Sequence, residues 1–330
     1  MNKERRNMLG IFSGLCAAAA MPGLARAQQA GYPANAVSIV VPFGAGGSTD
    51  YLGRLVANDL SARYPGKFIV ENKPGAGASI GTRFVATAPP DGRTLLYSTA
   101  TPFSINPYIY KTLPYDPDHD FTPAAMTVEV PLVLVVSRDM GINTLQELID
   151  HLLKNEATSS YGSYGAGTSG HIGGTVFARN IGAPGVLHVP YKDTQAVSDL
   201  VERRTTYMVD AWTPVAPFVA SGRLVVLGVC GNERLPWIPE VPTISSVINR
   251  DFDMSTWHAI FAPRSTKDGV LDFLNDEIKI TMAKDSVRKS AASQGFKAYP
   301  HMSRNEVEAF ILADRQRWKN HIEMAGIQRV

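Results

Sequence analysis

The sequence predicts a protein of the α/β class, and three observations support this. Residues 38–60 run from a short β-branched stretch through a glycine turn into a helical pattern. Strand-like and helix-like segments then alternate along most of the chain, which is typical of a parallel sheet covered by helices. A second glycine-rich turn, at residues 159–171, again precedes a helical pattern. A chain of 330 residues is long enough for about two such domains.

The first glycine turn joins a buried strand to an amphipathic helix. Residues 39–41 are all β-branched, as expected for a strand covered on both faces. Apolar residues then recur at helical spacing, and Ser48, Thr49 or Asp50 is expected to cap the helix. Glycines permit positive φ and leave amides facing outward at the positive end of the helix dipole. The turn is therefore a candidate anion site, although its glycines would also suit a tight turn with no ligand.

The other elements follow from the same patterns. Strands are expected at residues 68–70, 94–98, 131–137, 187–191, 207–210, 224–230 and 257–263. Helices are expected around residues 80–85, 144–153, 171–182, 194–202 and 270–282, and after residue 303. The helices near 144 and 303 begin with capping boxes, Thr144 with Glu147 and Ser303 with Glu306. The proline-rich passage around residues 106–117 is expected to be a loop.

The N-terminus has the form of a secretory signal peptide over residues 1–27. Basic residues precede an apolar run from Met8 to Ala20, and Ala25-Arg26-Ala27 is a small-x-small cleavage site. The paired Arg5-Arg6 leaves twin-arginine export open beside the general secretory route. The apolar run is too short to span a bilayer, and no later segment approaches the roughly 20 apolar residues that a span needs. We therefore expect an exported, soluble mature protein.

The charge of the mature chain limits the classes of partner that it can bind, and its cysteine content limits the disulfides that it can form. Four of the 32 Lys and Arg residues and one of the 30 Asp and Glu residues lie in the signal peptide, which leaves 28 basic against 29 acidic. Without a basic excess, attraction to nucleic acid or to an anionic membrane has no source, so we expect a small-molecule partner. Only Cys230 follows the cleavage site, which rules out an intrachain disulfide in the mature chain.

Motifs for cofactors and catalysis are weak. The first turn has no lysine of a phosphate loop, and Thr49 occupies the place of the third glycine in a dinucleotide motif. Gly165, Gly167 and Gly170 do satisfy that motif, with Asp193 at a suitable distance, but the preceding segment is polar where a buried strand is required. No G-x-S-x-G elbow occurs, and the seven histidines lack metal-ligand spacing. Asp116, Asp118, His119 and Asp120 are interpreted as solvated turn residues. We expect no metal, no cofactor and no enzymatic activity.

Six ordered motifs resemble those of a known family. They are VVPFGAGGSTD at residues 40–50, VENKPGAG at 70–77, LPYD at 113–116, YGAGTSGH at 164–171, VPYK at 189–192 and PEVPT at 239–243. The sequence resembles, over essentially the whole mature chain, the periplasmic solute receptors of tripartite tricarboxylate transporters, also called the Bug family. It departs from the family at Gly44, where proline or alanine is usual, and at residues 202–207, where a glycine-rich approach is common.

The resemblance implies an α/β, two-domain fold like that of type II periplasmic binding proteins, a Venus flytrap. Domain 1 would comprise residues 28–131 and 259–330, and domain 2 residues 132–258, with crossing strands near 132–137 and 257–263. The implied function is capture of a small carboxylate-containing solute in the interdomain cleft and its delivery to membrane transporter subunits, by a periplasmic monomer. A sensory receptor that contacts a signalling partner, and an exported enzyme acting on a carboxylate, are the alternatives.

The resemblance also implies the ligand-binding residues. Domain 1 would supply Phe43, Gly44, Ala45, Gly46, Gly47, Asp50, Ser98 and Thr99. Domain 2 would supply Ser163, Tyr164, Gly165, Thr168, His171, Tyr191 and Asp210. Structural alternatives remain for three of these: hydrogen bonding within the turn for His171, strand-end packing for Tyr191, and helix capping for Asp210.

Overall fold

The structure is a computed structural model, and it describes residues 32–33, 35–64, 67–192, 195–299 and 301–329. The predicted signal peptide, residues 1–27, lies outside the described residues. Pro33–Val330 form one compact unit. Within its described residues, no helix is both long and apolar enough to cross a membrane.

One group of strands contains the first glycine turn. Parallel strands β1 (Val37–Val41), β2 (Phe68–Asn72) and β3 (Thr94–Thr99) lie in the order β2-β1-β3. β9 (Ser255–Pro263) runs antiparallel to β3 and to the first part of β4 (Phe121–Ser137). The short β10 (Lys297–Ala298) pairs antiparallel with β4.

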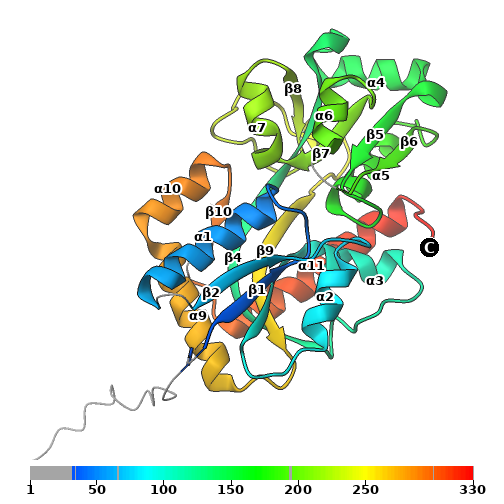
Figure 1. Ribbon diagram of the computed structural model, residues 1–330. Helices are drawn as coiled ribbons and strands as arrows, with labels where there is room; N and C mark the ends of the chain where they lie inside the picture. The colour runs from blue at the N-terminus through cyan, green and yellow to red at the C-terminus, as the bar shows by residue number, and fades with distance from the viewer. Residues whose placement is uncertain (1–31, 34, 65–66, 193–194, 300, 330) are drawn as a thin grey trace, which may run out of the picture. The chain divides into compact units, whose positions relative to one another are not determined.

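The second group continues from the same long strand. Residues 132–137 of β4 pair antiparallel with β7 (Tyr207–Ala211) and β8 (Leu224–Val229). β5 (Ser160–Ser163) runs parallel to both β6 (Leu187–Pro190) and β7. The α/β class is confirmed, but the expectation of a purely parallel sheet is wrong. β4 extends through both groups, and β9 pairs directly beside it in the opposite direction (Figure 1).

Helices connect and cover the strands (Figure 1). With the first group lie α1 (Ser48–Arg63), α2 (Ser79–Ala86), α3 (Asn106–Ile109), α9 (Asp268–Ala283), α10 (Asp285–Ser293) and α11 (Arg304–Met324). With the second lie α4 (Leu145–Lys154), α5 (Ser169–Asn180), α6 (Gln195–Val201), α7 (Trp212–Ala220) and α8 (Ile244–Ile248). Both predicted capping boxes are present, at the starts of α4 and α11.

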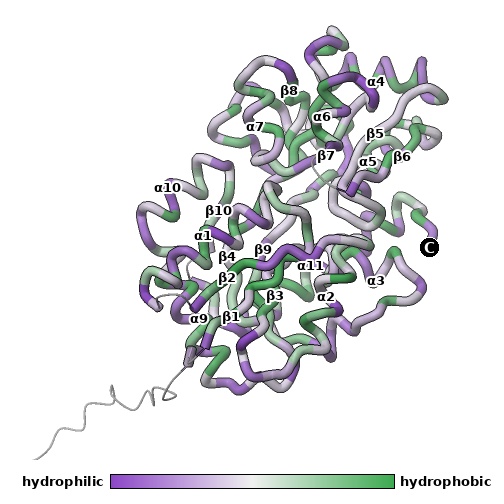
Figure 2. Tube along the Cα trace, viewed as in Figure 1, coloured by the Kyte–Doolittle hydropathy of each residue, from purple (hydrophilic) through white to green (hydrophobic). Residues whose placement is uncertain are grey.

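Two segments differ from the sequence-based expectation. Residues 101–105 form a π-helical turn, and residues 106–109 form α3 at the start of the passage expected to be a loop. Each proline sits in a first turn, which needs no proline N–H. β4 begins at Phe121, ten residues before the expected strand, and its early part contains Pro123 at a break in the β9 register. The hydrophobic core follows the central strands, and in Figure 2 the hydrophobic colour concentrates along strands such as β1 and β3.

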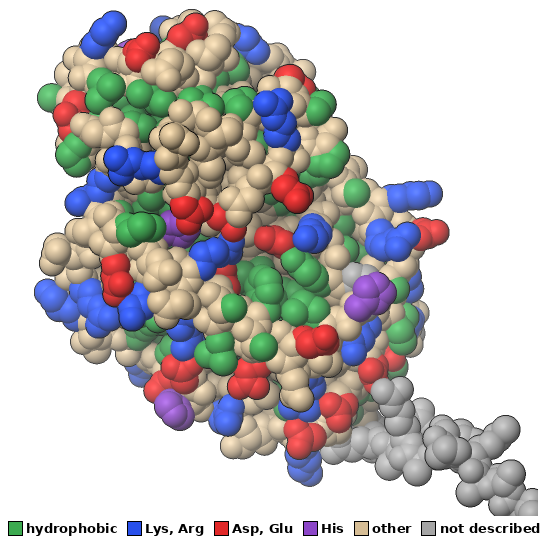
Figure 3. Space-filling model, turned by 180° about the vertical axis from the view of Figure 1, so that it is seen from behind, with side chains coloured by type: hydrophobic (Ala, Val, Ile, Leu, Met, Phe, Trp, Pro, Cys, Tyr) green, Lys and Arg blue, Asp and Glu red, His purple; other side chains and the backbone are tan. Residues whose placement is uncertain are grey.

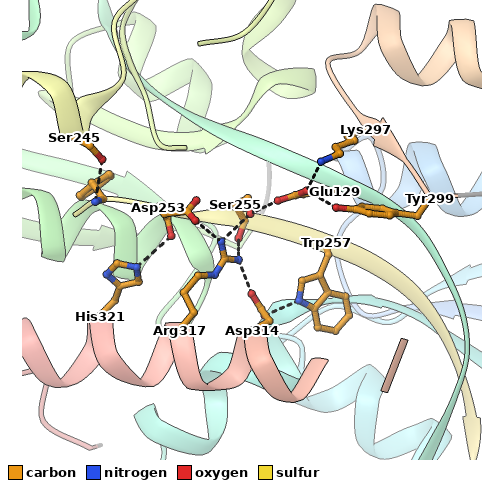
Figure 4. Close-up of polar contacts among 11 residues, drawn as sticks. Glu129, Ser245, Asp253, Ser255, Trp257, Lys297, Tyr299, Asp314, Arg317 and His321 are labelled. Carbon is orange, nitrogen blue, oxygen red and sulfur yellow. Dashed lines mark hydrogen bonds and ion pairs between the residues drawn. The ribbon is translucent and has the colours of Figure 1, made fainter. Parts of the chain in front are cut away.

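A polar network ties β4, β9 and α11 together (Figure 4). Ser255, the first residue of β9, donates to Glu129 of β4 at 2.7 Å and accepts from Arg317 of α11 at 3.1 Å. Two residues further along β9, the Trp257 indole N–H donates to Asp314 at 2.6 Å, and Asp314 also pairs with Arg317. The C-terminal helix is therefore fastened to the point where β4 and β9 run side by side.

Candidate solute-binding pocket

The two glycine turns identified in the sequence line the same pocket, which has a volume of about 520 Å³. The pocket lies at the carboxyl ends of the parallel strands, where ligands commonly bind in open α/β sheets. Most of the residues predicted from the sequence contribute to its lining: Phe43, Gly44, Ala45, Gly47, Thr99, Ser163, Tyr164, Gly165, Thr168, Tyr191 and Asp210. Four others, Gly46, Asp50, Ser98 and His171, lie outside that lining.

The first turn presents backbone amides at the start of α1. Its N-cap residue is Gly47, and no side chain caps the helix. The expectation that residues 48–50 would cap it is wrong, because Thr49 instead pairs with His258 and Asp50 binds the amide of Gly46. In the described chain, the amides of Gly44, Ala45 and Gly47 have no hydrogen-bond partner. These three amides are therefore available to a ligand, whereas that of Gly46 is not.

Asp50 holds this turn in place from behind. Its carboxylate accepts hydrogen bonds from the Gly46 N–H at 3.0 Å and from Asn72 at 2.9 Å, and it forms an ion pair with Arg54. Asn72 also donates to the carbonyl of Phe43 at 3.1 Å. Burial alone would raise the pKa of Asp50, but the hydrogen bonds from Arg54, Gly46 and Asn72 lower it below its usual value. Asp50 is thus an ionised residue that positions the turn.

The second turn places the start of α5 on the pocket. Thr168 caps α5 by accepting from the His171 N–H, and it donates to the carbonyl of Gly165 at 2.8 Å. The His171 ring accepts from the Gly167 N–H at 3.1 Å, which is the hydrogen bond within the turn expected under the structural alternative. Burial lowers the pKa of His171 to about 4, which keeps the ring neutral. The first residues of α5, Ser169 and Gly170, line the pocket.

Ser163 lies beneath this second turn. It is fully buried, accepts from the Gly165 N–H at 3.2 Å, and has its hydroxyl 2.7 Å from Nε2 of His188. Burial, followed by the neighbouring His171, lowers the pKa of His188 to about 3. The contact between Ser163 and His188 therefore holds the end of β5 against β6.

Asp210 is the acidic residue in the described lining of the pocket. Its Oδ2 accepts from the Tyr164 hydroxyl at 2.7 Å, and its Oδ1 accepts from the Ala211 N–H at 2.7 Å. The alternative that it caps α7 is not observed, because Ala211 is the N-cap and no side chain caps that helix. Burial raises the pKa of Asp210 to about 7, despite these two hydrogen bonds. Tyr191 also lines the pocket, and its hydroxyl donates to Asp199 at 3.0 Å.

Residues 52–327 match the family described as the tripartite tricarboxylate transporter family receptor. The chain belongs to this family. A protein encoded in the tcbD–tcbE intergenic region of Pseudomonas sp. strain P51 is 34% identical over 89% of this chain and 86% of its own length. Rpa4515 of R. palustris, solved with adipate, is 28% identical, covers 91% of this chain and all of its own, and has a TM-score of 0.87. MatC of Rhodopseudomonas palustris, solved with malate, is 26% identical, covers 88% of this chain and 99% of its own, and has a TM-score of 0.83.

Several lining residues of this receptor were missed from the sequence. β9 supplies Thr256 and His258, whose side chains are buried. The Nε2 of His258 lies 3.0 Å from the Thr49 hydroxyl, so this histidine supports the start of α1. A histidine in the otherwise apolar stretch 257–263 was the available signal.

Residues 74–78 and Tyr110 also line the receptor's pocket without having been predicted as site residues. The Tyr110 hydroxyl donates to the carbonyl of Ala166 at 3.0 Å, which joins α3 to the second glycine turn. Gly77 approaches the same carbonyl so closely that an added Cβ would lie 2.7 Å from it. The motif at residues 70–77 therefore contributes to the wall of the pocket as well as to the family resemblance.

Proposed function

We propose that this receptor captures a small carboxylate-containing solute in the periplasm and delivers it to the membrane subunits of a tripartite transporter. One observation carries the proposal: the N-terminal ends of α1 and α5 open onto the same pocket. Helix N-termini favour anions, because several amides point toward the ligand and the helix dipole is positive there.

Recognition of the carboxylate is proposed to rest on backbone amides. Lys192, which is exposed, is the one Lys or Arg side chain in the described lining. Two or three charge-assisted hydrogen bonds, each contributing about 1.5–3 kcal/mol, are enough for micromolar binding, which corresponds to about −8 kcal/mol. On the face seen in Figure 3, basic and acidic side chains are interspersed, so this face offers no single-sign surface for nucleic acid.

The related structures support a carboxylate ligand. Rpa4515 was solved with adipate and MatC with malate, and both molecules are carboxylates. The pocket volume of about 520 Å³ lies within the range usual for small-molecule sites. Phe43, Gly44, Ala45, Gly47 and Thr99 on one side, and the predicted residues from Ser163 to Asp210 on the other, are the proposed contacts.

The proposed working motion is closure of two domains around the solute. Domain 1 would be residues 28–131 and 259–330, and domain 2 residues 132–258. β4 passes between the two strand groups at residues 131–132, where its partner changes from β9 to β7 and β8. A hinge built on β4 and on the residues before β9 would let closure exclude water from the carboxylate.

Proline substitutions at the first helical positions test the proposal. Ser48→Pro removes the amide of the first residue of α1, which lines the pocket and whose N–H has no hydrogen-bond partner in the described chain. Gly47 has ψ 174°, the extended backbone that a residue before proline requires. Ser169→Pro removes the corresponding amide of α5. The preceding Thr168 has ψ 158°, so proline is tolerated there as well. Each should weaken carboxylate binding by about 10- to 100-fold in calorimetry. Ser48→Ala and Ser169→Ala, which keep the amides, should cost only a few-fold.

Asp268→Pro at the start of α9, outside the pocket lining, is the control for the proline itself. Equal losses in all three proline variants, or no stabilisation of the wild type by any carboxylate, would contradict the proposal. Carboxylate that is recovered chemically unchanged after incubation separates a receptor from an enzyme. Loss of solute uptake on deletion separates transport from a purely sensory role.

A further inference from the structure

We propose that the solute carries a protonated amine in addition to its carboxylate, and that Asp210 binds this amine. The inference rests on the proposed function, since it assumes that a carboxylate occupies the pocket at the starts of α1 and α5. It narrows the solute class from carboxylates in general to amino-carboxylates.

Asp210 is held rigidly where a ligand can reach it. The residue is only 6% exposed and lines the pocket, together with its neighbours Met208, Val209 and Ala211. Its backbone is fixed in β7, where Asp210 lies opposite Val133 of β4. The side chain is fixed at both oxygens by the Tyr164 hydroxyl and the Ala211 N–H. A carboxyl group anchored in this way cannot turn away to find another partner.

The protein supplies no cation to this carboxyl group. None of the ion pairs formed by the described residues includes Asp210. Lys192 lines the pocket but is exposed and is not paired with Asp210. His258, the histidine in the lining, is kept neutral because burial lowers its pKa to about 3. A buried carboxylate without a counter-ion is costly, so a cation that arrives with the ligand would be bound strongly.

The hydrogen bonds favour the acceptor role of Asp210. The Ala211 amide can only donate, and the Tyr164 hydroxyl donates to the other oxygen, so both oxygens already act as acceptors. Each retains a lone pair for a donor of the ligand. An ammonium group has three N–H donors and matches this arrangement. A metal ion fits less well, since the described residues contain no group of three or more His, Cys, Asp or Glu side chains that could hold one.

The pocket therefore combines groups that favour opposite charges. The helix ends of α1 and α5 favour negative charge, while Asp210 favours positive charge. A zwitterionic solute satisfies both at once. A simple dicarboxylate that filled the pocket would bring a second negative charge toward Asp210, at a cost in affinity unless that residue were protonated.

Calorimetry with matched ligands tests this inference. Aspartate is compared with succinate, glutamate with glutarate, and γ-aminobutyrate with butyrate, so that each pair differs in the amine. We expect the tightest ligand of the wild type to carry the amine. Asp210→Asn, which keeps the shape and an acceptor, should weaken that ligand by about 10- to 100-fold and so remove most of its advantage over its amine-free counterpart.

Tyr164→Phe is the second variant, since it frees one Asp210 oxygen without removing the carboxylate. It should preserve the preference for the amine even where overall affinity falls. If carboxylates bind but the amine gives no advantage, or if Asp210→Asn weakens both members of each pair equally, this inference is wrong and the proposed function stands. If neutral solutes bind and no carboxylate does, the proposed function itself is wrong.

Discussion

The backbone N–H of Gly46 donates a hydrogen bond to Oδ2 of Asp50 at 3.0 Å. One amide of the first glycine turn is thus used internally, and its use fixes the direction of the others. Gly46 has φ 86°, in the left-handed region that glycine adopts readily. Asp50 of α1 ties the turn to Arg54 and to Asn72 of β2.

Asp50→Asn should therefore lower both stability and solute affinity. The substitution removes the charge that Arg54 faces and one acceptor for the turn, at a cost of about 1–3 kcal/mol. Urea unfolding and calorimetry measure the two effects. Asp59→Asn on the same helix breaks a comparable set of contacts, with Arg63 and Lys284, outside the pocket lining, and should lower stability while affinity is retained. An Asp50→Asn variant with wild-type affinity would show that this carboxylate does not position the turn.

Features set by residues close together in the sequence were predicted correctly, whereas contacts between distant segments were not. The strand, glycine turn and start of α1 follow from periodicity and from the conformational freedom of glycine, so they were predicted correctly. The partner of Asp50 was not predicted, because its bond to Asn72 depends on β2 packing beside β1. His258 was missed for the same reason: its contact with Thr49 joins residues 209 positions apart. α3 was missed because prolines at helix starts resemble prolines in loops.

Tyr110→Phe should weaken solute retention without unfolding the protein. The Tyr110 hydroxyl donates to the Ala166 carbonyl across the pocket, and a hydrogen bond of this kind contributes about 0.5–1.5 kcal/mol. Its loss should raise the solute dissociation rate by about 2- to 12-fold in stopped-flow measurements. Tyr108→Phe, two residues earlier in α3, is the matched control, because the Tyr108 hydroxyl has no hydrogen bond within the described chain. Identical dissociation rates for the wild type and Tyr110→Phe would argue against a role for this contact.

Asp314→Ala should be among the most destabilising substitutions outside the pocket. The Asp314 side chain is 2% exposed. It accepts a hydrogen bond from the indole N–H of fully buried Trp257 and pairs with the guanidinium of Arg317 (Figure 4). Its removal leaves the buried indole N–H without a partner and takes away one of the two carboxylates that pair with Arg317, the other being Asp253, which together cost about 3–5 kcal/mol. Urea unfolding with an unchanged m-value would measure this loss. Glu323→Ala, on the same helix, breaks an exposed pair with Lys319 and should cost less than about 1 kcal/mol.

The pH dependence of stability should differ between the solute-free wild type and Asp210→Asn. The folded state raises the pKa of Asp210 from 3.8 to about 7. Between these two pH values the folded protein retains a proton that the unfolded chain releases, so the free energy of unfolding falls as the pH rises. The free energy of unfolding falls by about 4 kcal/mol in all, at about 1.36 kcal/mol per pKa unit. This destabilisation is complete above pH 7 and absent below about pH 4.

Buried histidines act in the opposite direction and make the comparison with Asp210→Asn necessary. Burial lowers the pKa of His171, His188 and His258, so their contribution to stability is lost as the pH falls below about 6.5. The variant keeps all three histidines, and subtracting its unfolding free energy from that of the wild type isolates Asp210. The difference should decline steadily from pH 4 to pH 7 in urea titrations. A bound amino-carboxylate should reduce the decline, because an ammonium group beside Asp210 lowers the pKa of that carboxyl group. A flat difference in the solute-free protein would show that Asp210 is already ionised at pH 4, with a counter-ion that the protein provides.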